Sequence, residues 1–410
     1  MATPRIGVPT ANVLGLPDRV REAGGEPVPL TLPARHPKGG VALVREWVAD
    51  TLQISCVREY LDALLLGTAE PPGELAGLLI AALRLNLPTV AAPATSDPYP
   101  FSIVPYALGL APLGEDPAEV AVAMAQKGGP LPAELVEGFS LANALRAGCA
   151  LDGGPETIVH LAAVAREAGV VGFSQMMRVL VPETSAVAGV TSAWYLKHRA
   201  GGLLAHLGET LNDAKTVTGV LKQELPEAPP SPDRAGARLL FVRARASGAE
   251  ALCRVEGAPA EVAGVCRVFG SDEEAARAIG KGLDEETLPV VVGCGPRAGP
   301  GLIKLERLGE AFDDAGLAET VITDGLASGR AAGTQISLFT PEAASEGVIG
   351  RLRDGDTLRI DLTEGRIRTG VKAGELESRD PYEVPDPADA GYAARYARSA
   401  LPALEGAGYG

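Results

Sequence analysis

The stretch Glu224-Leu225-Pro226-Glu227-Ala228-Pro229-Pro230-Ser231-Pro232-Asp233 divides this chain of 410 residues into two parts. Four of the seven residues from 226 to 232 are proline. Because proline has a fixed φ angle and no backbone N–H, such a run continues neither a helix nor a central strand. We therefore predict a linker over 225–236, between one domain at 1–224 and another at 237–410. The length allows two domains with a sizeable core.

Upstream of the linker the pattern predicts an α/β domain. Short apolar runs at Arg5–Val8 and Ala63–Gly67 are typical of buried strands, and the second leads into a predicted helix at Gly77–Leu85. Apolar residues recur at helical spacing over Thr157–Ala168, where Gly169 follows as a C-cap signal. Helices thus alternate with strands along this part of the chain.

Downstream of the linker the segments shorten and turn towards strands. The sequence predicts strands at Arg238–Val242, Leu288–Val292 and Thr357–Leu362, and helices at Asp272–Ile279 and Lys304–Ala315. Asp354-Gly355-Asp356 forms a turn signal before the last strand. We predict a mainly β second domain with flanking helices.

Charge and composition exclude several classes of function. The net charge of −15 argues against non-specific nucleic-acid binding, which needs a clustered basic face. Aromatic residues make up only 4%, too few to indicate a platform for stacking bases. We expect no nucleic-acid partner.

The sequence also predicts a cytoplasmic protein without a membrane segment. No run of eighteen uncharged apolar residues occurs, and the N-terminus lacks a basic segment followed by an apolar one. The five cysteines are odd in number and scattered, without a CxxC pair. This pattern does not indicate disulfides and fits a reducing compartment.

Several motifs occur in an order and spacing that point to one family. The first part contains DGGPET at Asp152–Thr157, HRAGG at His198–Gly202 and TVTG at Thr216–Gly219. The second part contains GPRAGPG at Gly295–Gly301, and Thr323-Asp324-Gly325 followed by Ser328-Gly329. Over residues 138–375 these motifs resemble the dihydroxy-acid dehydratase and phosphogluconate dehydratase family, of which this chain looks like a shortened, divergent member.

The resemblance implies a fold and a chemistry. It implies an α/β first domain, a barrel-like second domain and an active site between them in a homodimer. In the family, a [2Fe–2S] cluster held by three cysteines takes the leaving hydroxyl of a dihydroxy acid. A magnesium ion held by carboxylates and a carbamylated lysine orients the substrate, and a serine is the base. Both metal centres act as Lewis acids.

The residues that would hold these metal centres are missing. Thr68–Gly73 stands where the family has a GCDK turn, and Ala91–Phe101 contains no cysteine. No acid occurs in Pro27–Pro33, and Lys304 stands where the family has a glutamate. We therefore predict a cluster-free protein with no metal and no other cofactor. Nothing in the spacing of His36, Glu70 and Glu74 demands a substitute metal.

Three residues are the candidates for acid–base chemistry. Ser328 matches the family's catalytic serine, although an isolated serine hydroxyl is a poor base at neutral pH and needs another stabiliser. Lys304 could supply positive charge where the magnesium ion sat, or be a solvated lysine at a helix start. His198 could move a proton near pH 7, or have a structural capping role.

Further polar residues of the motifs are candidates for substrate binding. Arg199 could clamp a carboxylate with two hydrogen bonds, although a structural role is the alternative. The other predicted ligands are Glu156, Thr157, Asp324, Arg297 and Arg330, and a solvated side chain is the alternative for the two arginines. His160 lies among apolar residues of a helix face and is predicted to be a core histidine.

We expect a lyase that performs a dehydration, elimination or related proton transfer on a small polar hydroxy acid. Because the usual inorganic parts are missing, a specialised biosynthetic pathway is favoured over the family's usual one. The alternative is a non-catalytic relative that binds a ligand or a partner. Loss of every metal ligand at once is what relaxed catalytic demand would leave.

Overall fold

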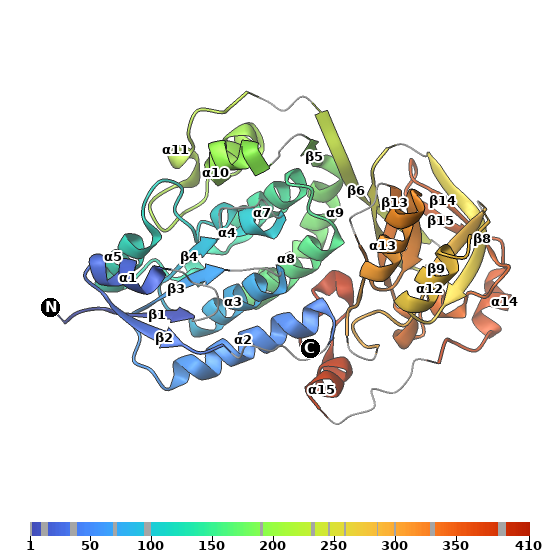
Figure 1. The fold of residues 1–410 in the computed structure, drawn as a ribbon, viewed down its shortest axis with the longest axis horizontal. Coiled ribbons are helices and arrows are strands. Elements are labelled where there is room, and N and C mark those ends of the chain that lie inside the picture. Colours follow the sequence, from blue (N-terminus) through green and yellow to red (C-terminus); the bar gives the residue numbers. More distant parts are fainter. Residues whose placement is uncertain are drawn as a thin grey trace.

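The chain folds into an N-terminal α/β region and a C-terminal barrel, which lie side by side along the longest axis (Figure 1). The structure, a computed structural model, describes residues 2–9, 15–32, 39–68, 72–93, 100–188, 192–230, 234–244, 247–257, 260–284, 286–298, 301–328, 333–383 and 391–410. The fold class predicted from the sequence is confirmed. The domain boundaries placed around the linker stay predictions.

The α/β region is built on a four-stranded parallel sheet with the order β2-β1-β3-β4. Its strands are β1 (Arg5–Pro9), β2 (Glu26–Leu30), β3 (Ala63–Thr68) and β4 (Thr89–Pro93). Ala63 to Leu66 are fully buried, as expected for a central parallel strand that helices cover on both faces. The two strands predicted here are therefore confirmed.

Helices pack around this sheet and extend from it towards the barrel. They are α1 (Leu16–Glu22), α2 (Val41–Val57), α3 (Pro72–Leu85), α4 (Val104–Ala107), α5 (Pro117–Lys127), α6 (Pro132–Leu135), α7 (Gly138–Ala150), α8 (Pro155–Glu167), α9 (Phe173–Glu183), α10 (Ser192–His206) and α11 (Leu221–Glu224). Helix α5 shows local sequence control, because the Asp116 carboxylate accepts hydrogen bonds from two first-turn amides. Helices α8 and α9 lie on the side that faces the barrel (Figure 1).

A nine-stranded sheet forms the C-terminal part, in the order β15-β14-β8-β9-β11-β13-β7-β6-β5. Its strands are β5 (Ser185–Ala188), β6 (Arg234–Ala244), β7 (Ala249–Val255), β8 (Glu261–Phe269), β9 (Thr287–Val291), β11 (Glu319–Thr323), β13 (Gly333–Thr340), β14 (Thr357–Asp361) and β15 (Arg366–Thr369). A parallel pairing of β15 with β6 closes the ring and leaves β5 outside it. The barrel-like architecture that the resemblance implied is thus confirmed.

Four helices and a small two-stranded ladder accompany the barrel. The helices are α12 (Asp272–Ile279), α13 (Glu306–Ala315), α14 (Ala373–Ser378) and α15 (Tyr392–Ser399). The ladder pairs β10 (Lys304–Leu305) in parallel with β12 (Leu326–Ala327). The predicted helix at Lys304–Ala315 was wrong at its start, because Lys304 and Leu305 extend to pair with β12 before the helix begins at Glu306.

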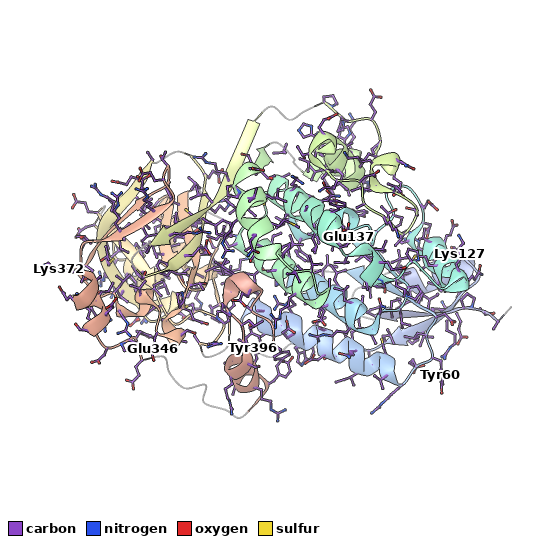
Figure 2. The ribbon with its side chains drawn as sticks, turned by 180° about the vertical axis from the view of Figure 1, so that it is seen from behind. Tyr60, Lys127, Glu137, Glu346, Lys372 and Tyr396 are labelled. Carbon is purple, nitrogen blue, oxygen red and sulfur yellow. The ribbon has the colours of Figure 1, made fainter. Side chains whose placement is uncertain are left out.

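The C-terminal segment returns from the barrel to the α/β region. Tyr396 is fully buried and belongs to the same core as the parallel sheet and its helices. Figure 2 shows Tyr396 where the two parts of the molecule meet. At the same junction the Val41 amide donates to the Leu302 carbonyl across 2.9 Å. Backbone contacts therefore join α2 to the loop that precedes β10.

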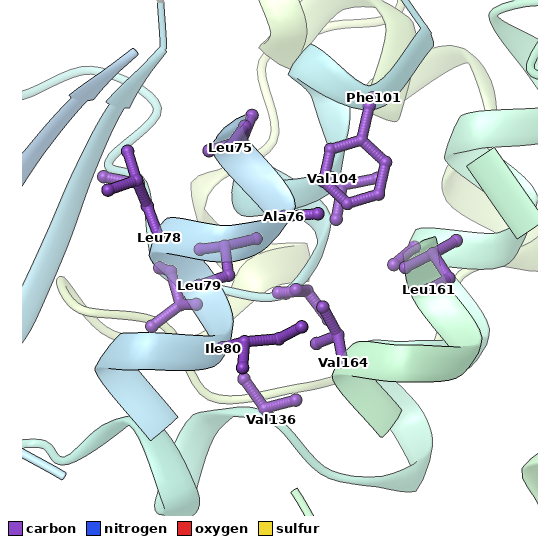
Figure 3. Packing of buried hydrophobic residues seen from close by; sticks show 14 of the residues in the cluster. Leu75, Ala76, Leu78, Leu79, Ile80, Phe101, Val104, Val136, Leu161 and Val164 are labelled. Atoms are coloured by element: carbon purple, nitrogen blue, oxygen red, sulfur yellow. The ribbon is translucent and has the colours of Figure 1, made fainter. Parts of the chain in front are cut away.

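Helix α3 lies at the centre of the larger hydrophobic core. Its Ala76 lies near Phe101, and its Ile80 lies near Val164 of α8, which also carries Leu161 (Figure 3). All five side chains are at most 1% exposed. Burial of this kind contributes about 25 cal/mol for each Å² of apolar surface removed from water. The packing of α3 against α8 fixes the position of α8, which carries several predicted site residues.

Candidate functional site

Lys304 and Glu156 meet between the two parts of the molecule. The Lys304 Nζ donates to Glu156 Oε2 across 2.9 Å. Lys304 is held by the β10–β12 ladder, whereas Glu156 lies in the first turn of α8 after Gly153-Gly154. A Cβ atom on Gly153 would lie 2.5 Å from the Gly148 carbonyl oxygen, so the turn that delivers Glu156 requires glycine there. The structure thus brings two predicted site residues into direct contact.

His160 lies one helical turn beyond Glu156 and is fully buried. An Arg45 Nη1 donor lies 3.3 Å from His160 Nδ1. Because a guanidinium only donates, Nδ1 is the acceptor and Nε2 carries the hydrogen of the neutral ring. Nε2 faces Glu156 Oε1 at 3.8 Å, a separation that gives an electrostatic contact and no direct hydrogen bond.

The charges around Glu156 and His160 set their protonation. Burial opposes ionisation of Glu156, but the His160 ring and the Lys304 ammonium outweigh it and lower its pKa to about 2. Burial, together with the positive charges of Arg45 and Lys304, lowers the pKa of His160. At neutral pH the cluster therefore contains an ammonium, a carboxylate and an uncharged imidazole. His160 is buried as predicted, yet it belongs to a polar cluster.

Arg45 extends this cluster into the α/β region. It is fully buried on α2, where its Nε and Nη2 donate to Glu46 Oε1 at 3.0 and 2.8 Å. Arg84 on α3 continues the network to Glu46 and to the more exposed Asp50 and Glu167. Sequence reasoning missed the role of Arg45. The available signal was an adjacent arginine and glutamate inside the otherwise apolar run VALVREWV (residues 41–48).

Ser328 faces a second buried carboxylate. Its hydroxyl donates to Glu319 Oε2 across 2.8 Å, and the Gln335 amide donates to the same oxygen. Glu319 is fully buried at the start of β11, and burial raises the pKa of its carboxyl group. Its other oxygen, Oε1, has no hydrogen-bond partner among the described residues. Sequence reasoning missed Glu319, because only the strand pairing brings it to Ser328.

A second ion pair joins the two parts near these residues. Arg254 Nη2 on β7 lies 2.9 Å from Asp152 Oδ2, immediately before the glycine turn of α8. Asp152 has a φ angle of 58°, which places it in the left-handed region. The positive charge of Arg254 also acts on Glu319, where it opposes the effect of burial on the pKa. Arg254 therefore connects the α8 turn electrostatically with the Ser328 loop.

Asp324 organises the glycine-rich loops of the barrel. Its fully buried carboxylate accepts hydrogen bonds from the amides of Cys294 at 2.9 Å, Ala343 at 3.0 Å and Gly293 at 3.2 Å. Neighbouring Glu342 accepts from the Arg297 amide at 3.0 Å. Burial and the charge of Asp324 raise the pKa of Glu342 to about 8.

Other predicted ligands have more distant positions. The exposed Arg297 donates through Nε to the Ala400 carbonyl at 2.9 Å, which ties the C-terminal segment to the barrel. Thr157 is 5% exposed in the first turn of α8, beside Glu156. Arg330 lies outside the described residues. Substrate binding by these residues and by Asp324 stays a prediction.

His198 and Arg199 lie on α10, which Figure 1 shows well away from the barrel. Arg199 breaks the regular helix with φ 58° and ψ −173°. The ring of His198 lies 4.8 Å from that of Trp194, measured between centroids. These residues are therefore not gathered with Lys304 and Ser328 within the single chain. Their predicted roles in proton transfer and carboxylate binding stay predictions.

The cysteines do not fit the cluster that the resemblance implies. Such a cluster needs several thiolates around one site. All five cysteines are described, buried and free, and they are spread over α2, α7, β7, β8 and the loop after β9. Burial raises the pKa of Cys149, Cys253 and Cys266 to about 12 each, which keeps these thiols protonated at neutral pH. They do not form a three-thiolate ligand set.

The described ranges contain neither a metal-ligand group nor a membrane-spanning helix. Within these ranges, no three His, Cys, Asp or Glu side chains form a group able to hold a metal ion. His36, Glu70 and parts of the segments matched to the family's metal motifs, 69–71 and 94–99, lie outside them. None of the described helices combines the length and apolarity needed to cross a membrane.

Fold and site define a two-part protein in which a parallel α/β region and a β-barrel enclose polar side chains. Comparison with known proteins agrees. Residues 234–407 match the family model described as Dihydroxy-acid/6-phosphogluconate dehydratase C-terminal. The chain belongs to the dihydroxy-acid/6-phosphogluconate dehydratase family.

Individual relatives cover more of the sequence. The dihydroxy-acid dehydratase of Geobacter metallireducens is 30% identical over 307 residues, which are 68% of this chain and 56% of the relative. That of Sulfurisphaera tokodaii is 31% identical over 356 residues, 78% of this chain and 61% of the relative. Dihydroxy-acid dehydratase 2 of Bordetella bronchiseptica is 31% identical over 348 residues, which are 75% of this chain and 61% of the relative. The matches thus span little more than half the length of these relatives.

Proposed function

We propose that this chain is a dehydratase-type lyase that acts on a small polar hydroxy acid without an iron–sulfur cluster. The observation that carries the proposal is the hydrogen bond from the Ser328 hydroxyl to the buried Glu319 carboxylate. Family membership supports the reaction class, because the matched relatives are named dihydroxy-acid dehydratases.

Glu319 supplies the activation that an isolated serine lacks. A hydroxyl becomes an effective base or nucleophile when a neighbouring group can accept its proton. Burial raises the pKa of Glu319, which makes its carboxylate a stronger proton acceptor than a solvated glutamate. In the proposed reaction, Ser328 removes the proton from carbon 2, next to the substrate carboxylate, while Glu319 takes the serine proton. The bond between carbon 3 and its hydroxyl oxygen breaks, and the hydroxyl leaves as water with the proton that Glu319 has taken. The resulting enol then becomes the 2-oxo acid.

Lys304 and Glu156 provide the polar contacts for the rest of the substrate. Lys304 pairs in register with Leu326, which lies two residues before Ser328. Standard strand spacings therefore place the Cα atoms of Lys304 and Ser328 about 8 Å apart. A small hydroxy acid spans that distance between side chains. The Lys304 ammonium binds the substrate carboxylate, and the Glu156 carboxylate accepts a hydrogen bond from a substrate hydroxyl.

The proposal also covers the absence of a cluster, the pathway, the compartment and the oligomeric state. The five cysteines are buried, protonated and dispersed, which supports a reaction that does not use a three-thiolate cluster. We assign the chain to a specialised biosynthetic pathway in the cytoplasm and to a homodimer, as the family resemblance implies. In such a dimer, His198 and Arg199 of one subunit would complete the site of the other.

Turnover of a panel of 2,3-dihydroxy acids tests the proposal. The purified chain is incubated with each acid in D2O. NMR then measures deuterium incorporation at carbon 2 and formation of the 2-oxo acid. We expect Ser328→Ala and Glu319→Gln to lower the rate by about 100-fold. Ser378→Ala is the matched control, because that exposed hydroxyl bonds only to the Glu375 carbonyl of its own helix.

The same preparation distinguishes the alternatives. Stoichiometric iron with visible cluster absorbance, and activity that is lost with the iron, would overturn the cluster-free proposal. Equal rates for wild type and Ser328→Ala would overturn the assigned base. Saturable binding of a dihydroxy acid without exchange or turnover would instead identify a non-catalytic ligand-binding relative.

A further inference from the structure

A large cavity lies in the barrel, apart from the Lys304 and Ser328 sites. Its volume is about 520 Å³, within the range of pockets that hold small organic ligands. Val371 and Ala373 line it, and Figure 2 shows the intervening Lys372 at the outer end of the barrel, far from the α/β region. The cavity therefore belongs to a different part of the molecule from the proposed lyase site.

The cavity lies beside the shortest strand pairing of the barrel. Strand β15 pairs with β6 through a single register pair, Arg366 with Arg243. The neighbouring pairs of this ring, such as β14 with β15, run over several residues. Because pairing is so short here, apolar residues of the barrel interior become part of the cavity wall. They include Phe339, Leu358 and Ile367, and Leu376 of α14 also lines the cavity.

Positive charge surrounds this apolar wall. The charged residues that line the cavity are one glutamate, Glu377, and four arginines: Arg243, Arg351, Arg366 and Arg368. Two of the arginines face one another in register across β6 and β15, an arrangement that is unfavourable for like charges. In a chain of net charge −15, this concentration of guanidinium groups is a local exception.

Nearby carboxylates neutralise these arginines only in part. Glu364 is shared by Arg366 at 2.7 Å and Arg368 at 3.5 Å. Glu250 is likewise shared by Arg243 and by Arg178, which lies outside the cavity. Arg351 has its own partner, Glu346 at 3.7 Å, and donates to the carbonyls of Glu377 and Arg379. The sharing of Glu364 and of Glu250 leaves positive charge beside Arg243, Arg366 and Arg368, where an anion would relieve the repulsion between arginines.

We propose that this cavity binds an amphipathic carboxylate, with an apolar tail in the barrel and its carboxylate among the arginines. The apolar wall removes the tail from water, and the guanidiniums supply charge-assisted hydrogen bonds to the head. A chain of medium length, such as that of octanoate, suits the volume. This site is independent of the proposed lyase reaction.

Calorimetric titration of the full chain with octanoate tests the proposal. We expect saturable binding at one site, weaker binding at high salt, and no saturable binding of 1-octanol or propionate under the same conditions. Arg368→Gln removes an exposed lining charge and should weaken binding about fivefold. Arg307→Gln is its control, because the similarly exposed Arg307 on α13 pairs with Glu273, and neither residue lines the cavity.

A second pair of variants tests the location. Ala373→Trp places a large side chain on an exposed lining position of α14, so it should abolish octanoate binding. Ser378→Trp, on the same helix but outside the lining, should leave binding unchanged. Absence of saturable octanoate binding would overturn the proposal. Binding of 1-octanol as tight as that of octanoate would also overturn it. So would an unchanged affinity for octanoate in a correctly folded Arg368→Gln or Ala373→Trp variant.

Discussion

The ammonium of Lys304 in the barrel and the carboxylate of Glu156 in the α/β region form an ion pair across 2.9 Å. The side chains are 28% and 16% exposed, so water screens the pair only in part. Lys304 thus joins the two parts of the chain. Its charge also contributes to the low pKa of Glu156.

Removal of Lys304 should destabilise the protein. Lys304→Met leaves Glu156 without its cation, and we expect a loss of about 1–3 kcal/mol in the free energy of unfolding. A double-mutant cycle with Glu156→Gln, measured by urea denaturation, isolates the coupling energy. The exposed pair Arg359–Glu261 is the control cycle and should give less than about 0.5 kcal/mol. Equal coupling in the two cycles would contradict a special role for Lys304.

The free energy of unfolding should depend less steeply on pH in the acid range when Lys304 is replaced by methionine. The pKa of Glu156 is lowered from 4.5 to about 2 in the folded protein. Its contribution is therefore present above the unfolded value of 4.5 and is lost as the pH falls towards 2. Without the ammonium the folded pKa rises, so the contribution becomes smaller. Unfolding free energies between pH 2 and 6 should show a shallower acid slope in Lys304→Met than in wild type.

Glu342 should make the protein less stable as the pH rises, which is the opposite of the effect of Glu156. Burial and the charge of Asp324 raise its pKa to about 8, so the folded protein retains a proton that the unfolded chain releases from about pH 4.5 upwards. Stability should therefore fall as the pH rises from 4.5 to 8, by about 3–5 kcal/mol. Glu342→Gln, which is neutral at every pH, should flatten this slope. Glu346→Gln changes an exposed carboxylate and should leave it intact; an unchanged slope in Glu342→Gln would refute the assignment.

Gly40 marks a close approach between α2 and the barrel loop. A Cβ atom there would lie 1.9 Å from the Leu302 carbonyl oxygen, so one backbone would have to move. We expect Gly40→Ala to cost about 1–3 kcal/mol in thermal unfolding and to increase proteolytic cleavage between the two parts. Gly114→Ala is the control, because an added methyl group meets no atom within 4 Å. A Gly40→Ala protein as stable as the control would show that the junction adapts freely.

Arg45 should be essential to the buried network. Among the described residues, Arg45→Met leaves the buried Glu46 with Arg84 as its one cationic partner, and we expect a loss of about 3–5 kcal/mol by urea denaturation. The double variant Arg45→Met/Glu46→Leu should recover part of that loss, because no uncompensated charge remains. Arg58→Met, at the exposed end of α2, should change stability by less than about 0.5 kcal/mol. No recovery in the double variant would mean that Arg45 acts through packing instead of charge.

Prediction of the fold succeeded where the chain carries a local signal. The apolar run Ala63–Gly67 predicted a strand whose residues from Ala63 to Leu66 are fully buried, and the helical pattern at Asp272–Ile279 predicted α12. The start of α13 was predicted wrongly, because Lys304 and Leu305 have no local strand signal. They extend only because Leu326 and Ala327 offer a pairing edge.

The candidate site was predicted less completely. Motif spacing singled out Glu156, Lys304 and Ser328, but it did not say which of them meet. It left His198 in one acid–base group with Ser328, whereas α10 lies away from the barrel within the chain (Figure 1). Glu319 escaped prediction because its partnership with Ser328 depends on the neighbouring positions of β11 and the loop after β12.

By itself, the sequence determined the α/β and barrel classes, the family and the dispersal of the cysteines, because periodicity and motif order are local properties of the chain. Only the tertiary structure decided that Lys304 pairs with Glu156 and that Ser328 donates to Glu319. The first partner lies 148 residues away. The Lys304 ammonium and the His160 ring lower the pKa of Glu156, whereas burial raises that of Glu319. Contact and desolvation of this kind arise only when distant segments pack together, so no local pattern encodes them.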